Sequence, residues 1–546
     1  MRPIRENAAA RAAARLSARR FFLLSFLVLF GAAAIWSAAS PILGGPDERA
    51  QVIKAAAVDH GQWTGCFLYA PKLGHCVPDP TKPDSQVKLP QFFALIAASV
   101  PHDPSDGPDL ACTIHRPTVP ASCMNSLDRP PSKRDITDGS ILYAHTYVAR
   151  YPPLYYLAVG LPSRLGGSSI DIYLMRLISA ALSALFLALA FTAAFCWSRN
   201  RLLVLGLLVA VTPMALYLAG VVNPSGLEIA SATAFWTAGT ILVTERLSDA
   251  PAGLRWLFAL SGATFALLRG ISPFWVACSL ALLALVPRRA ALARALRGPR
   301  LLLPLAAIAA ASLGALAWII PEHALLQFHG TLHAGVPANV STFTILANSF
   351  GHTRYYLADM VGVFGSFDAY SPLVTFVVWG LLVLGLVLAA MRLGGRRAVV
   401  LLALLVVGII LLPVAISSSH AHEYGYNWSG RDTLPLGVGL PILAAGFLGA
   451  WSSGEGRERA LRRASGALLP LWGVAQFLAF AEALRRNAVG THGAIVGFIT
   501  RASWHPAIGI LPALLLEIVA LAALGGVAAV VGARSTGSPP RSPASP

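Results

Sequence analysis

The chain has 546 residues, of which 56% are apolar and only 12% are charged. Soluble proteins carry about 25% charged residues, so this composition excludes a soluble enzyme and predicts an all-α polytopic membrane protein. The formal net charge is +17. Because the arginines lie mostly in short loops and tails, this charge is typical of cytoplasmic segments, and we expect no nucleic-acid partner.

The first apolar run covers residues 21–40 and is long enough to cross a bilayer, which takes about 20 residues. It follows a basic tail, residues 1–20, which we expect in the cytoplasm. A basic segment before an apolar run is also typical of a signal peptide. Since no clean small-residue cleavage site follows, we predict a retained anchor helix that runs outward.

Two adjacent carboxylates, Asp47 and Glu48, come directly after this helix and begin a long polar loop, residues 41–150. Ionised groups are costly inside a bilayer, so we expect both acids at the outer water boundary. One interpretation is structural, with Pro46 starting a loop helix and the acids charging its first turn. The other is a functional site at the mouth of the membrane helix.

Four of the six cysteines fall in this first loop. Several cysteines in one loop indicate two disulfides and an oxidising compartment. The four are Cys66, Cys76, Cys112 and Cys123. Three pairings are open, and we favour the one that joins sequence neighbours. A zinc site is the alternative, but the usual CxxC spacing is absent.

Further apolar runs alternate with arginine-rich loops along the rest of the chain. These runs cover about 176–196, 202–222, 226–244, 256–287, 301–320, 372–391, 398–416, 433–451, 466–484 and 507–532. The run 256–287 is broken near Arg269 and is predicted to form two short helices, which gives about twelve helices with both ends in the cytoplasm. We therefore expect one transmembrane domain over 21–532, a second external loop at 321–371 and a disordered tail at 533–546.

Some polar residues within these apolar runs are candidates for function. Arg269 is one, because a buried arginine in a membrane protein is functional by default, although a shallow hairpin turn is equally compatible. Glu228 follows the turn before the run 226–244. We interpret it as an acid that favours the helix dipole, with an external site as the alternative.

Six short motifs follow one another in a fixed order after the first helix. They are Pro46-Asp47-Glu48, Tyr151-Pro152-Pro153-Leu154-Tyr155-Tyr156, Thr212-Pro213-Met214, Gly220-Val221-Val222-Asn223-Pro224, Gly362-Val363-Phe364-Gly365-Ser366-Phe367-Asp368 and Gly430-Arg431-Asp432-Thr433-Leu434-Pro435. Together they resemble a bacterial membrane family catalogued as domain of unknown function 2142, over about residues 21–530. That family is similar to the GT-C superfamily of integral membrane glycosyltransferases.

The resemblance implies a lipid-linked sugar donor and an essential acid in the first external loop, a position that Asp47 matches. Two positions depart from the family's pattern. Gln51 stands where the family often has histidine, and Asp432 stands where it often has tyrosine. Either departure could alter specificity or mark a degenerate site.

The hypothesis that follows is transfer of a sugar from polyprenyl phosphate to a glycan or lipid acceptor outside the plasma membrane. Asp47 would be the general base, with Glu48 assisting or orienting it. Arginines suit the leaving phosphate, and the candidates are Arg150, Arg354 and Arg431. Candidates for sugar or acceptor contacts are Tyr155, Asn223 and Asp368.

No cofactor is indicated by the sequence, and a divalent metal is left open. The expected partners are membrane lipid, the polyprenyl-phosphate sugar and the acceptor. Three alternatives remain: a transporter or flippase of lipid-linked saccharide, a glycan polymerase or ligase, and a catalytically silent assembly protein. A transporter would place acids near the bilayer midplane and often contains internal repeats, whereas most acids here lie in loops.

Overall fold

The structure is a computed structural model of the chain. It describes residues 16–64, 68–70, 75–77, 85–88, 113, 116–122, 143–166, 168–322, 324, 335–426, 428–449 and 455–533. In this part of the chain most residues are helical, and the strands form three two-stranded antiparallel sheets.

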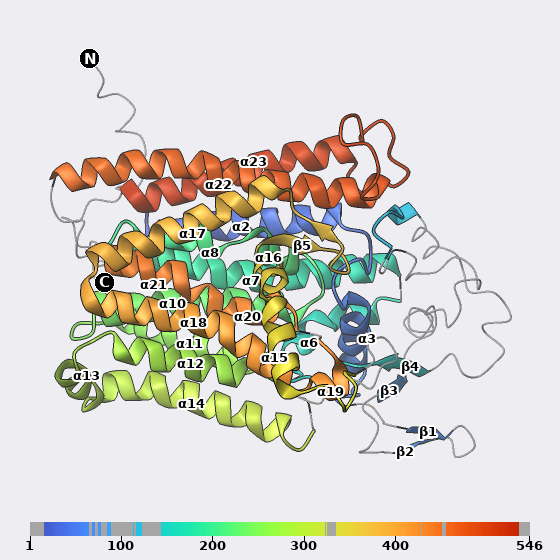
Figure 1. Cartoon of the computed structure of the whole chain (residues 1–546), viewed down its shortest axis with the longest axis horizontal. Helices are drawn as coiled ribbons and strands as arrows, with labels where there is room; N and C mark the ends of the chain where they lie inside the picture. The colour runs from blue at the N-terminus through green and yellow to red at the C-terminus, as the bar shows by residue number, and fades with distance from the viewer. Residues whose placement is uncertain are drawn as a thin grey trace, which may run out of the picture.

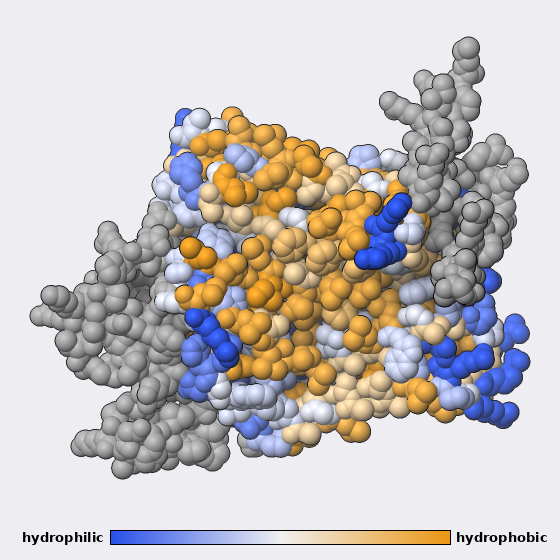
Figure 2. Space-filling model, turned by 180° about the vertical axis from the view of Figure 1, so that it is seen from behind, coloured by the Kyte–Doolittle hydropathy of each residue, from blue (hydrophilic) through white to orange (hydrophobic). Residues whose placement is uncertain are grey.

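Long apolar helices run roughly side by side and make up the body of the molecule (Figure 1). They are α2 (Ala18–Ala39), α7 (Ser169–Trp197), α10 (Pro224–Glu245), α14 (Pro299–Ile319), α17 (Leu373–Leu393), α18 (Gly395–Ser419), the Leu468–Val489 part of α22 (Glu455–Val489), and α23 (Ile510–Ala533). At 1.5 Å per residue, a helix of about 22 residues is about 33 Å long, which matches the hydrocarbon core of a bilayer. Apolar side chains form a broad band across the face shown in Figure 2, with hydrophilic residues toward its two ends.

The predicted twelve long spans are not confirmed. Within the described residues, eight helices are long and apolar enough to span a membrane, or nine if a bent pair counts as one span. The bent pair is α12 (Ser272–Leu285) with α13 (Arg289–Leu296), at 117°. The other predicted spans form shorter helices: α8 (Leu203–Ala210), α9 (Pro213–Ala219), α11 (Ala252–Ala266), α20 (Gly430–Gly437) and α21 (Gly439–Leu448).

Proline and glycine explain these breaks. Pro213 begins α9 directly after α8, where its fixed φ and missing N–H suit the first turn of a new helix. The turn between α11 and α12 contains Gly270 and carries Arg269. The prediction of two short helices that meet near Arg269 is therefore confirmed.

The central helix of the bundle is α10, and 94% of the residues in its most apolar stretch are buried. It packs against α7, α11, α21 and α9. A Cβ at Gly446 of α21 would lie 2.3 Å from Cγ2 of Thr240 in α10, so only glycine permits this approach. Small residues of this kind let membrane helices pack closely without a hydrophobic driving force between them. The core thus fixes α10, whose N-terminal end carries functional candidates.

One end of the bundle, here called the loop end, carries short elements. They are α3 (Glu48–Asp59), β1 (Leu68–Ala70), β2 (His75–Val77), β3 (Ser85–Lys88), β4 (Tyr143–Thr146), α6 (Leu154–Val159), the 3₁₀ helix η4 (Leu161–Arg164), α15 (Thr342–Gly351), α16 (Thr353–Gly362), β5 (Val363–Phe364), β6 (Ala369–Tyr370) and α19 (Ala421–Tyr424). Of these, α3 and β1 to β4 lie at the right of Figure 1, and α15 and α16 lie nearer its centre. The two predicted external loops both supply elements to this end. The arginine-bearing helix α13 lies at the opposite end.

The strand pairs within the first loop have defined registers. Ser85 pairs with Thr146 and Lys88 with Tyr143, while Leu68 pairs with Val77. Three of the four loop cysteines lie outside the described residues, and of Cys76 only the backbone, in β2, is described. The predicted disulfides therefore stay predictions. So do the predicted tails at 1–20 and 533–546, of which residues 1–15 and 534–546 lie outside the described residues.

Candidate functional site

Asp47 lies at the loop end, in the turn between α2 and α3. Its φ of 55° is in the left-handed region, which residues with a Cβ rarely adopt. Asn223 holds this turn, because its Nδ2 donates to the carbonyl oxygen of Pro46 at 2.8 Å while its Oδ1 caps α10 through the Ser225 N–H at 2.9 Å. The strained backbone is thus fixed against the start of α10, and the Asp47 side chain stays 29% exposed.

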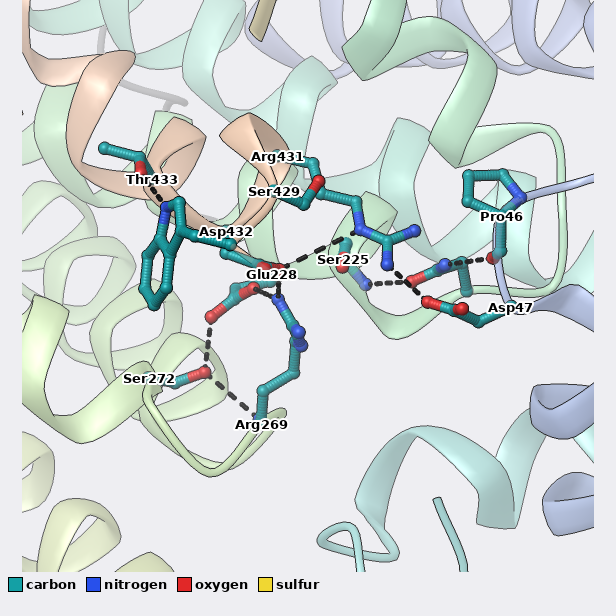
Figure 3. Close-up of polar contacts among 12 residues, drawn as sticks. Pro46, Asp47, Ser225, Glu228, Arg269, Ser272, Ser429, Arg431, Asp432 and Thr433 are labelled. Carbon is teal, nitrogen blue, oxygen red and sulfur yellow. Dashed lines mark hydrogen bonds and ion pairs between the residues drawn. The ribbon is translucent and has the colours of Figure 1, made fainter. Parts of the chain in front are cut away.

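The Asp47 carboxylate contacts two side chains from distant parts of the chain, and Figure 3 shows the contact with Arg431. Its Oδ2 forms an ion pair with Nη2 of Arg431, and its Oδ1 accepts a hydrogen bond from the hydroxyl of Tyr147. Burial alone would raise the pKa of Asp47, but the Arg431 charge and the hydrogen bonds from Tyr147 and Arg431 together lower it. Asp47 is therefore ionised at neutral pH, and it is poised beside a cation.

Arg431 begins a chain of alternating charges that leads into the bundle. Its Nε lies 3.9 Å from Asp432, whose Oδ1 accepts a hydrogen bond from Nη1 of Arg269 at 2.6 Å. The same Nη1 lies 3.4 Å from Oε2 of Glu228. We call these five residues the charge chain: Asp47, Arg431, Asp432, Arg269 and Glu228.

Burial makes the inner part of the charge chain rigid. The Glu228 side chain is fully buried and that of Arg269 is 9% exposed. Ser272 donates to Oε1 of Glu228 at 2.6 Å and accepts from the Arg269 N–H at 3.1 Å, which ties the α11–α12 turn to α10. Removing one member of such a buried pair costs about 3–5 kcal/mol, so each residue holds its neighbours in place.

The guanidinium of Arg431 has N–H groups that are not used in hydrogen bonds to the described residues. Its plane packs over the Phe367 ring at 4.9 Å, and its Nε and Nη1 donate no hydrogen bond within the described part of the chain. Both atoms are buried. Unused guanidinium donors beside an exposed carboxylate suit an oxyanion such as a phosphate.

Glu48, the second acid of the predicted pair, lies in the interior of the protein. It is fully buried in a two-point ion pair with Arg176 of α7, at 2.7 and 2.6 Å. Its oxygens also accept from the N–H groups of Gly45 at 3.0 Å and Val222 at 2.9 Å. These bonds hold the turn before Asp47, and the prediction that Glu48 assists or orients Asp47 stays a prediction.

Two of the predicted sugar or acceptor contacts are structural in this conformation. Tyr155 is buried, and its hydroxyl donates to Ser179 at 2.9 Å, bracing α6 against α7. Asn223 uses both ends of its amide on the Asp47 turn and on the α10 cap. The polar atoms of both residues bond to the protein, and their predicted substrate contacts stay predictions.

The remaining predicted residues lie outside the charge chain. Asp368 forms a nearly buried ion pair with Arg486 of α22. Arg354 is exposed and packs over the ring of Tyr355 at 4.6 Å. Arg150 is buried and its Nη1 donates to the carbonyl oxygen of Glu322 at 3.4 Å. Their predicted roles toward a substrate stay predictions.

The sequence reasoning missed several members of the site. Tyr147 and Asp359 lie in the two long loops predicted from the sequence, and nothing in the local sequence distinguishes them from other loop residues. Glu228 was interpreted as a dipole acid, yet it pairs with Arg269, another polar residue within the apolar runs. Two such charges of opposite sign predict an internal ion pair, and this signal was available.

No group of three His, Cys, Asp or Glu side chains that could hold a metal ion occurs in the part of the chain that the structure describes. The question of a divalent metal stays as the sequence left it.

The sequence model of one protein family, described as predicted membrane protein DUF2142, matches residues 29–438. The chain belongs to this family. The resemblance found in the six motifs is thereby confirmed, and the family description agrees with the membrane-spanning helices of the fold. No protein of curated function matches the chain.

Two solved structures are similar in part. One is ArnT from Cupriavidus metallidurans in the apo state, with 16% identity and a TM-score of 0.36 over 70% of this chain and 66% of that one. The other is the same protein bound to undecaprenyl phosphate, with 14% identity and a TM-score of 0.34 over 70% and 67% of the two chains. This chain thus matches about two thirds of their length.

Proposed function

We propose that this family member is a membrane glycosyltransferase. It would move a sugar from a polyprenyl-phosphate donor to a glycan or lipid acceptor, with the loop end outside the plasma membrane of a bacterium. The observation that carries this proposal is the pairing of an exposed, strained acid, Asp47, with a buried arginine, Arg431, that keeps unused donors. A base and a phosphate-binding cation then stand side by side where the apolar body meets the loops.

The transfer step needs both groups. The hydroxyl oxygen of the acceptor bonds to the anomeric carbon of the sugar while the bond from that carbon to the phosphate oxygen breaks. The polyprenyl phosphate leaves with the electron pair and gains negative charge, which Arg431 neutralises. The hydroxyl proton passes to Asp47 and from there to water, a role worth about 10²- to 10⁴-fold in rate.

The ion pair itself explains how Asp47 becomes a better base when the donor binds. In the free protein, Arg431 and Tyr147 hold the pKa of Asp47 below its usual range, against the effect of burial. A donor phosphate competes for the guanidinium of Arg431, so part of this stabilisation is lost. The pKa of Asp47 then rises toward the range in which a carboxylate accepts a proton well.

A transporter fits the charge positions less well. Glu228, the innermost acid of the charge chain, is the fifth residue of the 22-residue helix α10. At 1.5 Å per residue it lies about 6 Å from the end of that helix. Transporters place their intramembrane acids near the bilayer midplane, whereas this chain of charges stays close to the loop end.

The test is a transfer assay with purified protein in nanodiscs, radiolabelled polyprenyl-phosphate sugars and a membrane acceptor extract. Wild type should transfer label and Asp47→Asn should not, although it inserts and folds normally. Asp249→Asn is the matched control, because Asp249 is half exposed and follows the C-terminal end of α10, opposite to the end that carries Glu228. Full transfer by Asp47→Asn would overturn the proposal.

A further inference from the structure

Asp359 of α16 lies behind the site and binds the start of α20, the helix that carries Arg431. It is 6% exposed. Its Oδ2 accepts hydrogen bonds from the hydroxyl of Ser429 at 2.5 Å and from the backbone N–H of Arg431 at 3.3 Å. Ser429 does not cap α20 with its own side chain, so the carboxylate from α16 serves this helix start instead.

The backbone geometry makes this contact close and specific. A Cβ at Gly430 would lie 1.9 Å from the carbonyl oxygen of Tyr356 and 3.0 Å from Cβ of Asp359. The first turn of α20 is therefore pressed directly onto α16, and no larger residue fits. A shift of α16 would move Arg431 away from Asp47.

We propose that Asp359 is a positioning residue, which fixes the first turn of α20 and thereby places the guanidinium of Arg431 beside Asp47. This role rests on the proposed function of Asp47 and Arg431. Asp359 reaches the reacting groups only through Arg431, so it takes no part in the transfer itself.

The second carboxylate oxygen indicates that the contact depends on pH. Oδ1 of Asp359 is buried and has no hydrogen-bond partner within the described residues. Burial raises the pKa of Asp359 to about 6, although the Ser429 hydrogen bond and the Arg431 charge oppose this rise. Below this pH the carboxyl is neutral, and its hydrogen bonds to the start of α20 lose their charge-assisted strength.

Other titratable groups around Asp359 come from each element packed on α16. Arg431 and Asp432 face it from α20, and Tyr370 of β6 interacts with it. Helix α9 contributes one titratable residue, Tyr217, while α15 and the first turn of α17 contain none. Helix α16 itself has His352 as its N-cap and carries Arg354, Tyr355 and Tyr356. Because histidine also titrates near pH 6, the experiment includes a His352 control.

Trp428 gives a direct readout of this helix start. Its indole N–H donates to the Thr433 hydroxyl at 2.9 Å, across the first turn of α20. The experiment records the fluorescence difference between the full-length protein and its Trp428→Phe variant in nanodiscs from pH 8 to pH 5. Wild type and His352→Gln should show a transition near pH 6, and Asp359→Asn should show none.

Ser429→Ala is the second variant, and it keeps the carboxylate. Because the Ser429 hydrogen bond lowers the pKa of Asp359, its loss should move the transition to higher pH. A transition that persists in Asp359→Asn would overturn the proposal. So would a transition whose pH is the same in Ser429→Ala as in wild type.

Activity then separates this proposal from the function on which it rests. At pH 7.5, Asp359→Asn should lower kcat by about 10- to 100-fold with little change in KM for the acceptor, because a misplaced group costs rate. The step near pH 6 on the acid side of the wild-type pH profile should be absent from Asp359→Asn. An unchanged kcat and pH profile would overturn the positioning role, whereas absence of transfer by wild type, with the fluorescence transition intact, would overturn the proposed function.

Discussion

The buried pair of Glu48 and Arg176 offers the sharpest test of how the turn before Asp47 is held. Both side chains are fully buried, and the guanidinium also donates to the carbonyl oxygens of Ser37 and Ser40 at 3.0 Å each. Glu48→Gln keeps the shape of the side chain and removes its charge. The guanidinium is then left in the core without its counterion.

The expected loss of stability is large. Breaking a buried ion pair by removing one partner costs about 3–5 kcal/mol, a large share of the roughly 5–15 kcal/mol that stabilises a typical native protein. The double variant Glu48→Gln with Arg176→Gln should lose less than the sum of the two single variants, by about 2 kcal/mol or more. The reason is that no unpaired charge remains in the core.

The assay is reversible unfolding of purified protein in mixed micelles, followed by tryptophan fluorescence and circular dichroism against increasing denaturing detergent. Asp249→Asn is the control, since it removes an exposed ion pair worth about 1 kcal/mol or less. Additive losses in the double variant, or a Glu48→Gln loss no larger than that of the control, would refute the assignment of Glu48 to a structural ion pair.

Three further predictions concern the site and the first loop. Arg431→Lys should lower kcat by about 10²-fold or more in the transfer assay, because lysine cannot supply the paired donors of a guanidinium; an unchanged kcat would remove Arg431 from the site. Tyr147→Phe removes a hydrogen bond that lowers the pKa of Asp47, so the step of the pH–rate profile that belongs to Asp47, which lies below the step of Asp359, should move to higher pH. A shift of that step to lower pH would contradict the geometry. Burial lowers the pKa of Lys54 to about 7 from 10.5, so the unfolded chain binds a proton that the folded chain lacks between these values. Stability should therefore rise with pH between about 7 and 10, by up to about 1.4 kcal/mol per unit, and Lys54→Met should abolish that slope in unfolding titrations.

The class of fold could be predicted from the sequence, and so could a candidate site at the mouth of the first helix. Apolar runs and arginine-rich loops predicted a bundle of membrane helices, and the acids after the first run predicted a site at its mouth. Asp47, Arg269 and Arg431 were all candidates from the sequence, and the structure brings the three together in one charge chain. The cost of a charge near a bilayer pointed to Asp47 and Arg269, whereas Arg431 was a candidate because arginine suits a leaving phosphate.

The contacts between distant segments were out of reach of such reasoning. Glu48 and Asp47 are neighbours in sequence, yet the left-handed turn at Asp47 sends one carboxylate toward Arg431 and the other into the core against Arg176. Nothing in the sequence states which of two adjacent acids remains accessible. Helix lengths failed for a related reason, since a proline such as Pro213 either bends a span or ends it, depending on tertiary packing.

The two departures from the family's pattern can now be judged on physical grounds. A tyrosine at position 432 would offer Arg269 no full negative charge, whereas Asp432 accepts from its Nη1 at 2.6 Å. Arg269 then has two carboxylate partners, Asp432 and the fully buried Glu228. Gln51 in turn accepts from the buried hydroxyl of Tyr156 at 2.5 Å.

Each substituted residue thus has a specific bonded partner in the interior. A buried charge costs stability unless it is paired, so a site without function has no reason to retain one. Here Asp432 instead joins Arg269 to Arg431 and completes the charge chain that ends at Asp47. The two departures therefore fit a different internal arrangement behind the proposed acid and arginine better than decay of the site.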